Sequence, residues 1–153
     1  QVCDLLLKIK PDSQAYLYEK ANMLIRLELF AEALDILYKL DFLRPNNATI
    51  AHEIIWCTLV CDDFEAAIRY FHRLEEMNKT NEIDWINMGH IHFIQGNRMD
   101  AYQSYRRAMM QMADLKKFLA AFRPDRPLLV EKGIRLDEVY LMEDQLISSW
   151  SEN

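Results

Sequence analysis

The sequence is poor in the residues that build tight turns. Its 153 residues include 3 glycines and 4 prolines, whereas folds made of many short strands need turn residues at close intervals. Leu, Ala, Met and Glu, which favour helices, are abundant. The composition therefore disfavours an all-β fold and predicts an all-α protein built from long helices.

Cysteine is also scarce. Cys3, Cys57 and Cys61 form an odd set without the spacing of small disulfide-rich secreted proteins, so we expect no structural disulfide. Cys57 and Cys61 lie four residues apart, which would place two metal ligands on one helix face. No second pair completes such a site, and packing as small apolar side chains is the favoured interpretation.

Long apolar runs and an excess of basic residues are absent as well. No apolar run reaches the length that crosses a bilayer, so we expect a soluble protein without membrane insertion and favour the cytoplasm as its compartment. The formal net charge is −6, whereas binding to a phosphate backbone depends on clustered Lys and Arg. Nucleic acid is therefore not an expected partner.

A spacing of 34 residues runs through the chain. Small residues recur at this interval, and each is followed by a larger apolar or aromatic residue four positions later and by Leu or Ala seven positions later. The aligned sets are Ala33, Ala67 and Ala101; Leu37, Phe71 and Tyr105; and Leu40, Leu74 and Ala108. An interval of this length indicates a repeat architecture in which each unit stacks on its neighbours.

Each repeat unit is predicted to be a pair of antiparallel helices. Turns are expected near Glu28, near Asp62 and at Gly96, and the sequences "RPNN" and "NKTN" should end the pairs. Two helices joined by a tight turn come closest near that turn. The alanine early in each second helix is therefore expected to let the helices touch, with the larger residues filling the space further away.

The pattern resembles the tetratricopeptide repeat, which has Trp, Leu-Gly and Tyr in its first helix and Ala, Phe and Pro in and after its second. The third unit matches best. Its matching positions are Trp85, Met88-Gly89, His92 in the aromatic place, Gly96, Ala101, Tyr105 and Ala108, with Ala113 in place of the Pro. The first unit keeps Ala33 and Pro45 but has Leu17 for the Trp, and the second is the most divergent.

The resemblance implies a right-handed α-α superhelix of antiparallel helix pairs, closed by a C-terminal capping helix. We expect repeats at 12–45, 46–79 and 80–113, preceded at 1–11 by the end of an earlier repeat helix. Residues 114–153 would extend the last repeat helix, through "ADLKKFLAAF", and then form the cap, with a turn at Gly133. Because the chain begins within a unit, we expect it to derive from a longer repeat protein.

Nothing in the sequence indicates catalysis. His90 and His92 lie two residues apart and would point to different sides of a helix, so they are poorly placed to share a metal. The repeat register instead places His92 in the core and His90 on the concave surface. No phosphate-binding glycine loop or nucleophile arrangement is present. We therefore expect no enzyme activity, no cofactor and no metal site.

The resemblance also implies that the first helix of each repeat lines a concave groove that binds a peptide or a partner protein. The residues expected on this face are Tyr18, Asn22, Arg26, His52, Trp56, Leu59, Asn87, His90 and Phe93. Aromatic side chains beside polar donors suit an extended peptide or an amphipathic helix. Packing of Trp56, Leu59 and Phe93 within the fold is an equally open interpretation.

Two alternatives to a peptide-binding scaffold remain open from the sequence. The apolar segment from Cys3 to Ile9 could join two chains into a homodimer. The repeats could also regulate a catalytic domain outside this sequence.

Overall fold

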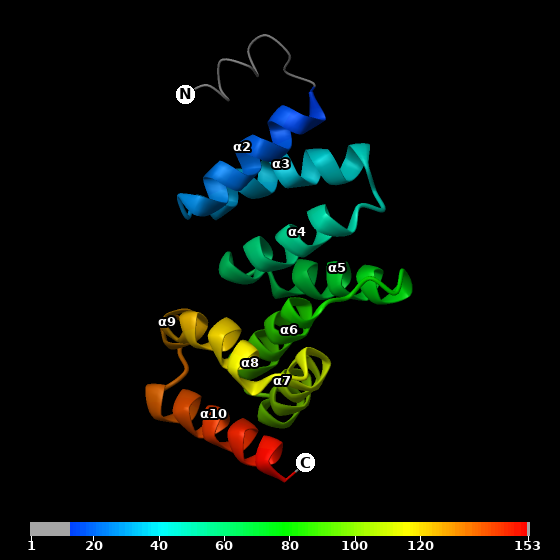
Figure 1. Ribbon diagram of the computed structural model, residues 1–153. Helices are drawn as coiled ribbons and strands as arrows, with labels where there is room; N and C mark the ends of the chain where they lie inside the picture. The colour runs from blue at the N-terminus through cyan, green and yellow to red at the C-terminus, as the bar shows by residue number, and fades with distance from the viewer. Residues whose placement is uncertain (1–12, 153) are drawn as a thin grey trace. The chain divides into compact units, whose positions relative to one another are not determined.

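The computed structural model describes residues 13–152, and all regular structure in this range is helical (Figure 1). The chain divides into two compact units, Gln1–Lys79 (unit 1) and Thr80–Asn153 (unit 2). Unit 1 contains α2 (Gln14–Arg26), α3 (Phe30–Leu43), α4 (Ala48–Val60) and α5 (Phe64–Glu76). Unit 2 contains α6 (Glu82–Ile94), α7 (Arg98–Met112), α8 (Leu115–Phe122), the short 3-10 helix η1 (Arg123–Asp125), α9 (Arg126–Glu131) and α10 (Leu136–Ser151).

The predicted all-α fold of paired helices is confirmed. Within unit 1, α2 packs on α3, α3 on α4, and α4 on α5; within unit 2, α6 packs on α7 (Figure 1). Among the helices described, none combines the length and the apolar character needed to cross a membrane. The expected end of an earlier repeat helix at residues 1–11 lies outside the described residues.

The helices start at the interval seen in the sequence. The first helices of the three pairs begin at Gln14, Ala48 and Glu82, and the second helices begin at Phe30, Phe64 and Arg98, each set 34 residues apart. The residues that precede the first helices are Ser13, Asn47 and Asn81. Asn81 accepts from the Asp84 amide at 2.9 Å, and Asp84 accepts from the Asn81 amide at 2.8 Å, so these two residues form a reciprocal cap.

The turn inside each pair has the same backbone geometry. Glu28, Asp62 and Gly96 are 34 residues apart and adopt positive φ angles of 58°, 65° and 83°. The amide that follows each of them donates to a carbonyl five residues earlier, at 2.8–2.9 Å. This left-handed residue ends the helix and satisfies its last carbonyl groups. Glycine meets the requirement only in the third pair; Glu and Asp adopt the same conformation in the others.

Close packing near the turns agrees with the predicted role of small residues. Ala33, Ala67 and Ala101 are each 0% exposed. In unit 2, Gly89 on α6 faces Tyr105 on α7, and a Cβ added at Gly89 would lie 2.4 Å from Cε1 of the Tyr105 ring. Gly89 therefore permits an approach of the two helices that a larger residue would prevent.

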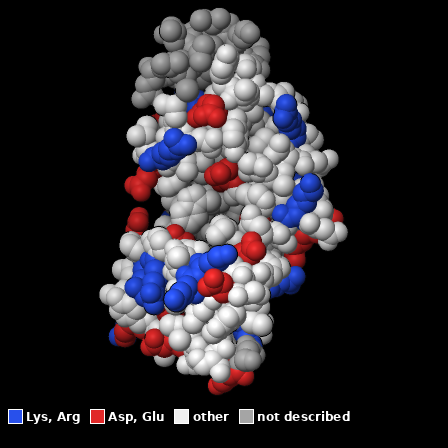
Figure 2. Space-filling model, viewed as in Figure 1, with Lys and Arg blue, Asp and Glu red and all other residues white. Residues whose placement is uncertain are grey.

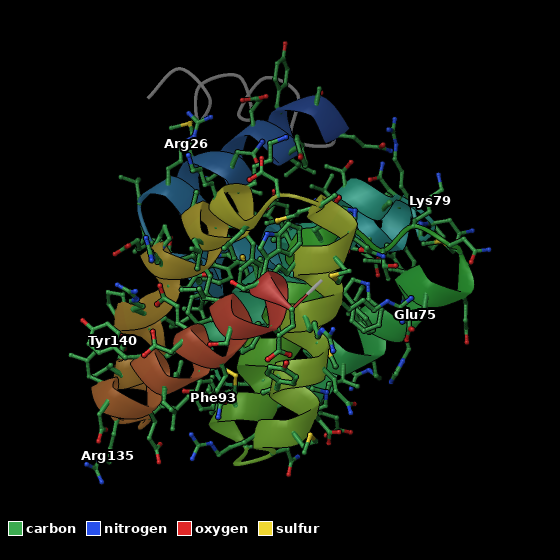
Figure 3. The ribbon with its side chains drawn as sticks, turned by 60° about the horizontal axis from the view of Figure 1, so that its bottom comes forward. Arg26, Glu75, Lys79, Phe93, Arg135 and Tyr140 are labelled. Atoms are coloured by element: carbon green, nitrogen blue, oxygen red, sulfur yellow. The ribbon has the colours of Figure 1, made fainter. Side chains whose placement is uncertain are left out.

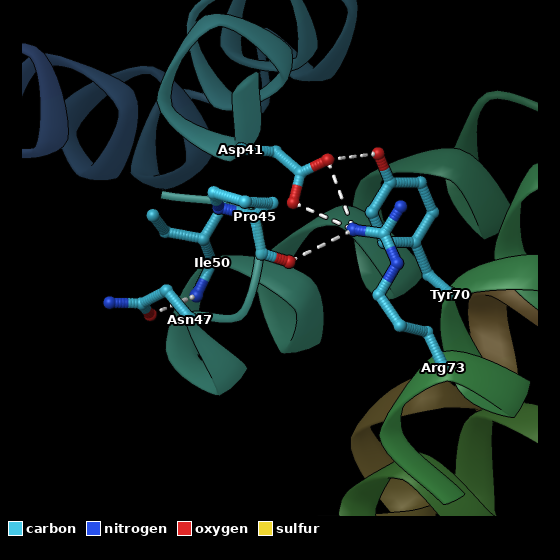
Figure 4. A network of polar contacts seen from close by, with 6 residues as sticks. All are labelled: Asp41, Pro45, Asn47, Ile50, Tyr70 and Arg73. Atoms are coloured by element: carbon cyan, nitrogen blue, oxygen red, sulfur yellow. Dashed lines mark hydrogen bonds and ion pairs between the residues drawn. The ribbon is translucent and has the colours of Figure 1, made fainter. Parts of the chain in front are cut away.

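A polar network joins the two helix pairs of unit 1. Asp41, near the end of α3, accepts from the Tyr70 hydroxyl at 2.7 Å and from Arg73 Nη1 at 2.8 Å (Figure 4). Arg73 also donates to the carbonyl of Pro45 at 3.4 Å, in the loop between the pairs. Burial, followed by the hydrogen bond from its hydroxyl to Asp41, raises the pKa of Tyr70 to about 12. The network links α5 to the end of α3 and to the loop before α4.

The repeat interval ends after α7, and one prediction is wrong at this point. Residues 113–122 do not prolong α7, because Ala113 adopts a φ of 53° and reverses the chain. The Asp114 side chain then caps α8 by accepting from the Lys117 amide at 3.1 Å. The predicted turn at Gly133 is confirmed, with a φ of 103°, and α10 follows it.

Residues after α7 complete the core of unit 2. Aromatic and aliphatic side chains from α8, α9 and α10 join those of α6 and α7 in one buried cluster. Its members from the last three helices are Phe118, Phe122, Leu129, Val139, Met142 and Leu146. The C-terminal segment is therefore an integral part of the packed interior of unit 2.

Candidate functional site

The first candidate surface lies on α2 and α4 of unit 1. Tyr18, Asn22 and Arg26 are spaced by four residues on α2, so their side chains lie on one face of that helix. His52 and Trp56 have the same spacing on α4. Arg26 is exposed and the other four are partly buried, so this face still presents aromatic and polar groups to solvent.

Glu53 on α4 influences the pKa of Tyr18 on α2. Burial raises the pKa of Tyr18, the nearby charge of Glu53 raises it further, and a side-chain hydrogen bond with Asn22 partly offsets the rise. Burial also raises the pKa of Glu53 itself, against the opposing effect of His52. Glu53 was not among the expected site residues. Its position directly after His52, on the exposed side of an otherwise apolar helix, is the sequence feature that would have pointed to it.

The remaining expected residue of unit 1, Leu59, belongs to the interior. It is 0% exposed, which agrees with the interpretation that it packs within the fold and not with its use as a surface contact. Cys57 is buried one turn after Glu53. Burial, with smaller contributions from Glu53 and Cys61, raises its pKa to about 12, which keeps the thiol protonated and unreactive at neutral pH.

In unit 2 the expected site residues are covered. Asn87, His90 and Phe93 on α6 are 2%, 0% and 3% exposed. Phe93 packs edge-to-face on Tyr105 of α7, with ring centroids 6.4 Å apart. Asn87 and His90 therefore do not present the binding surface predicted for them, and Phe93 follows the packing interpretation that the sequence left open.

The reason for the burial of His90 is the segment that follows α7. His90 Nδ1 lies 2.7 Å from the Tyr105 hydroxyl, and Nε2 lies 3.0 Å from Oδ2 of Asp125 in η1. The Phe122 ring adds a tilted contact at 5.8 Å between centroids. Both ring nitrogens are thus engaged within unit 2, and His90 links α6, α7 and η1.

The burial of the two histidines of α6 differs from what the sequence predicts. His90, expected on the surface, is fully buried, and His92, expected in the core, is only partly buried. Asp125 was not anticipated as a partner of His90. An aspartate between two prolines, in "RPDRP" directly after an apolar helix, is the signal that could have identified it.

No constellation in the described part of the chain resembles a metal centre. Groups of three or more His, Cys, Asp or Glu side chains able to hold an ion are not found among residues 13–152. The chemistry available on the α2 and α4 face is recognition through aromatic contact, amide hydrogen bonds and a partly buried carboxyl group.

Comparison with known proteins identifies the fold. No protein-family model and no curated protein sequence matches the chain. Among solved structures, the chain is similar to one described as the crystal structure of MamA, with a TM-score of 0.68 and 17% sequence identity. The match covers 98% of this chain and 85% of that chain. MamA is a TPR-like helical repeat protein, and the present chain therefore has a TPR-like helical repeat fold.

Proposed function

We propose that the protein is a noncatalytic interaction scaffold, and that its binding face is formed by α2 and α4 of unit 1. The observation that carries this proposal is the pair of partly buried Tyr18 and Asn22 on α2, whose Tyr18 is influenced by the charge of Glu53 on α4, the helix that also carries the partly buried Trp56. Aromatic side chains held on helices offer contact area at a small cost in conformational entropy. The TPR-like fold supports the assignment, because helical repeat proteins commonly present such surfaces to partners.

The character of the face favours a polypeptide ligand with hydrogen-bond donors. Glu53 has a raised pKa because it is partly removed from water, so a donor from a partner would compensate for its lost hydration. Asn22 offers both donor and acceptor groups to a peptide backbone. An extended peptide or an amphipathic helix that carries Lys or Arg near an apolar residue fits this combination.

Affinity capture from the native source, with the full-length protein as bait, tests the proposal. The double variant Tyr18→Ala, Trp56→Ala should lose a partner that the unaltered protein retains. Phe42→Ala is the matched control, because Phe42 is an aromatic residue of α3 that is 85% exposed. Circular dichroism melting curves confirm that each bait is folded. A partner retained equally by all three baits would overturn the assignment of this face.

The repeat boundaries 12–45, 46–79 and 80–113 are proposed on the interval of the helix starts, with 114–153 as the terminal segment. Self-association through Cys3 to Ile9 stays a prediction from sequence, because these residues lie outside the described range. Sedimentation velocity of a Leu6→Lys, Ile9→Lys variant tests it; a dimer that persists in this variant must use another surface. Regulation of a catalytic domain outside this sequence remains the alternative to a scaffold role.

A further inference from the structure

A buried carboxylate organises two arginines at the C-terminal end of unit 2. Glu143 of α10 is 3% exposed. It accepts from Nε of Arg123 at 2.6 Å and from Nε of Arg126 at 3.0 Å, and Nη2 of Arg126 also donates to it. Burial alone would raise the pKa of Glu143, but the hydrogen bonds and charges of Arg126 and Arg123 outweigh it and the pKa is lowered. The two guanidinium groups are thereby held in fixed positions.

An open pocket of about 570 Å³ lies beside these arginines. Pro127, Val130 and Glu131 of α9 and Leu136 and Tyr140 of α10 supply the rest of its lining. Three of the apolar members are exposed: Val130 by 42%, Leu136 by 47% and Tyr140 by 46%. The Arg126 guanidinium lies 4.9 Å from the centroid of the Tyr140 ring. Figure 3 shows Tyr140 and Arg135 on the same outer edge of the view, at the end of unit 2 where α10 begins. The pocket thus combines a cationic wall with an exposed apolar rim.

Positive charge is concentrated in the segment 115–135, which contributes Arg123 and Arg126 to the pocket. Residues 115–135 contain six Lys or Arg and two Asp or Glu, a net charge of +4, whereas the rest of the chain contains twelve and 22, a net charge of −10. Figure 2 shows Lys and Arg side chains gathered over α8 and α9. Of the two acidic residues, Asp125 is bonded to His90 and Glu131 lines the pocket. This segment is therefore basic although the protein as a whole is acidic. In contrast, α10 carries four Asp or Glu and no Lys or Arg, and one of these four, Glu143, is paired with Arg123 and Arg126.

Arg123 still has hydrogen-bond donors to offer. Within residues 13–152 its guanidinium bonds only Glu143, through Nε, and its side chain is 50% exposed. A guanidinium group carries five N–H donors, so the two terminal nitrogens remain available for a second carboxylate. Because Glu143 already fixes the orientation of the group, binding costs little further side-chain entropy.

The geometry points to a peptide-binding pocket between η1, α9 and α10 that takes an acidic segment of a partner protein. A carboxylate of the segment bonds the terminal nitrogens of Arg123, and a neighbouring apolar side chain packs on Val130, Leu136 and Tyr140. The apolar residues Val130, Leu136 and Tyr140 beside an oriented guanidinium group favour a peptide that carries both acidic and apolar side chains. This surface is separate from the α2 and α4 face of unit 1.

Fluorescence anisotropy with the full chain tests the pocket. The probe is a capped, fluorescein-labelled peptide in which aspartates alternate with leucines. We expect saturable binding that weakens by about tenfold or more in Arg123→Gln, since a charge-assisted carboxylate pair is lost. Arg135→Gln is the matched control: it removes the same charge from the same segment, at a side chain that is 76% exposed and outside the pocket lining. Its affinity for the probe should change by less than about twofold, because only long-range attraction is lost.

Two further arms distinguish the apolar contact from simple charge attraction. A probe with serine in place of leucine should bind more weakly to the unaltered protein, and titration with the original probe should shift the methyl resonances of Val130 and Leu136. The methyl measurement uses the unaltered chain, so it stands even if a variant is unstable. Equal weakening in both arginine variants, absence of saturable binding, or preference for phosphatidylserine vesicles over the peptide would each overturn the proposal. None of these readouts involves Tyr18 or Trp56, so the outcome is independent of the α2 and α4 face.

Discussion

Replacing Gly89 with alanine tests the packing of α6 on α7 directly. The added Cβ would lie 2.4, 2.5 and 2.9 Å from three carbon atoms of the Tyr105 ring. The ring has little freedom to move away, because Tyr105 is 0% exposed and its hydroxyl is bonded to His90. Phe122 also meets the ring edge-to-face at 5.1 Å between centroids. The clash must therefore separate the helices or displace several buried rings.

Two opposing terms set the size of the effect. Alanine is a better helix former than glycine by about 1 kcal/mol. Overpacking of a close-packed core costs about 1–3 kcal/mol, and occasionally more, and a contact with a confined aromatic ring belongs at the upper end of that range or beyond it. We therefore expect Gly89→Ala to lower the free energy of unfolding by about 2 kcal/mol. With a typical urea dependence, this lowers the urea midpoint by about 1 M.

A double-mutant cycle isolates the contact. Urea unfolding is followed by circular dichroism for the unaltered chain, Gly89→Ala, Tyr105→Leu and the double variant. Tyr105→Leu removes the ring, so Gly89→Ala should then be neutral or stabilising, and the coupling between the two positions should be about 2 kcal/mol or more. The reasoning is refuted if Gly89→Ala is neutral in the unaltered background, or if its cost is the same with leucine at position 105.

Three further predictions address the polar groups and the thiols. The pKa of Glu143 in the folded chain is lowered from 4.5, so its interactions stabilise the fold above pH 4.5 and that contribution is lost as the pH falls below this value. The variant Glu143→Gln should therefore lower the free energy of unfolding by about 2 kcal/mol at neutral pH and by progressively less in acid. Urea unfolding measured across pH checks this. The variant Asp41→Ala removes the carboxylate that accepts from Tyr70 and Arg73 on α5. It should lower the free energy of unfolding by about 1–3 kcal/mol and accelerate amide hydrogen exchange in unit 1. Unchanged exchange would contradict the role of the network. In a Cys3→Ser background, the exposed Cys61 should react with iodoacetamide in the folded chain, and the buried Cys57 should react only after unfolding. Mass spectrometry measures the two reaction rates. Equal rates for the two thiols would contradict the burial of Cys57.

The sequence was sufficient for the parts of the fold that repeat. Helix starts follow the 34-residue interval because each pair is built from contacts local in sequence, such as Ala101 against the neighbouring helix. The turn at Gly96 has a chemical signal, since glycine adopts a positive φ readily. The equivalent turns at Glu28 and Asp62 lack a glycine; the repeat interval located both, and the preference of Asp for helix starts supported the second.

The candidate site was less accessible to sequence reasoning. The interval predicts which residues share a helix face, but it does not reveal what covers that face. His90 is covered because Ala113 reverses the chain, and an alanine at φ 53° leaves no mark in the sequence. The contact between His90 and Asp125 then depends on the path of a segment outside the repeat. Tyr18 and Trp56, whose helices lie within the repeating part, are only partly buried.

The contact between Asp125 and His90 also restricts how the length of such an array can change. An extra helix pair inserted directly after α7 would place a new first helix between α6 and the segment that now covers it. His90 and Tyr105 would lose the groups that enclose them, and Phe118 and Phe122 would have to pack on a helix without a matching surface. A pair duplicated ahead of α6 leaves these contacts intact. These contacts therefore allow whole helix pairs to be added or removed before Asn81, and they tie the last pair to the segment that follows it.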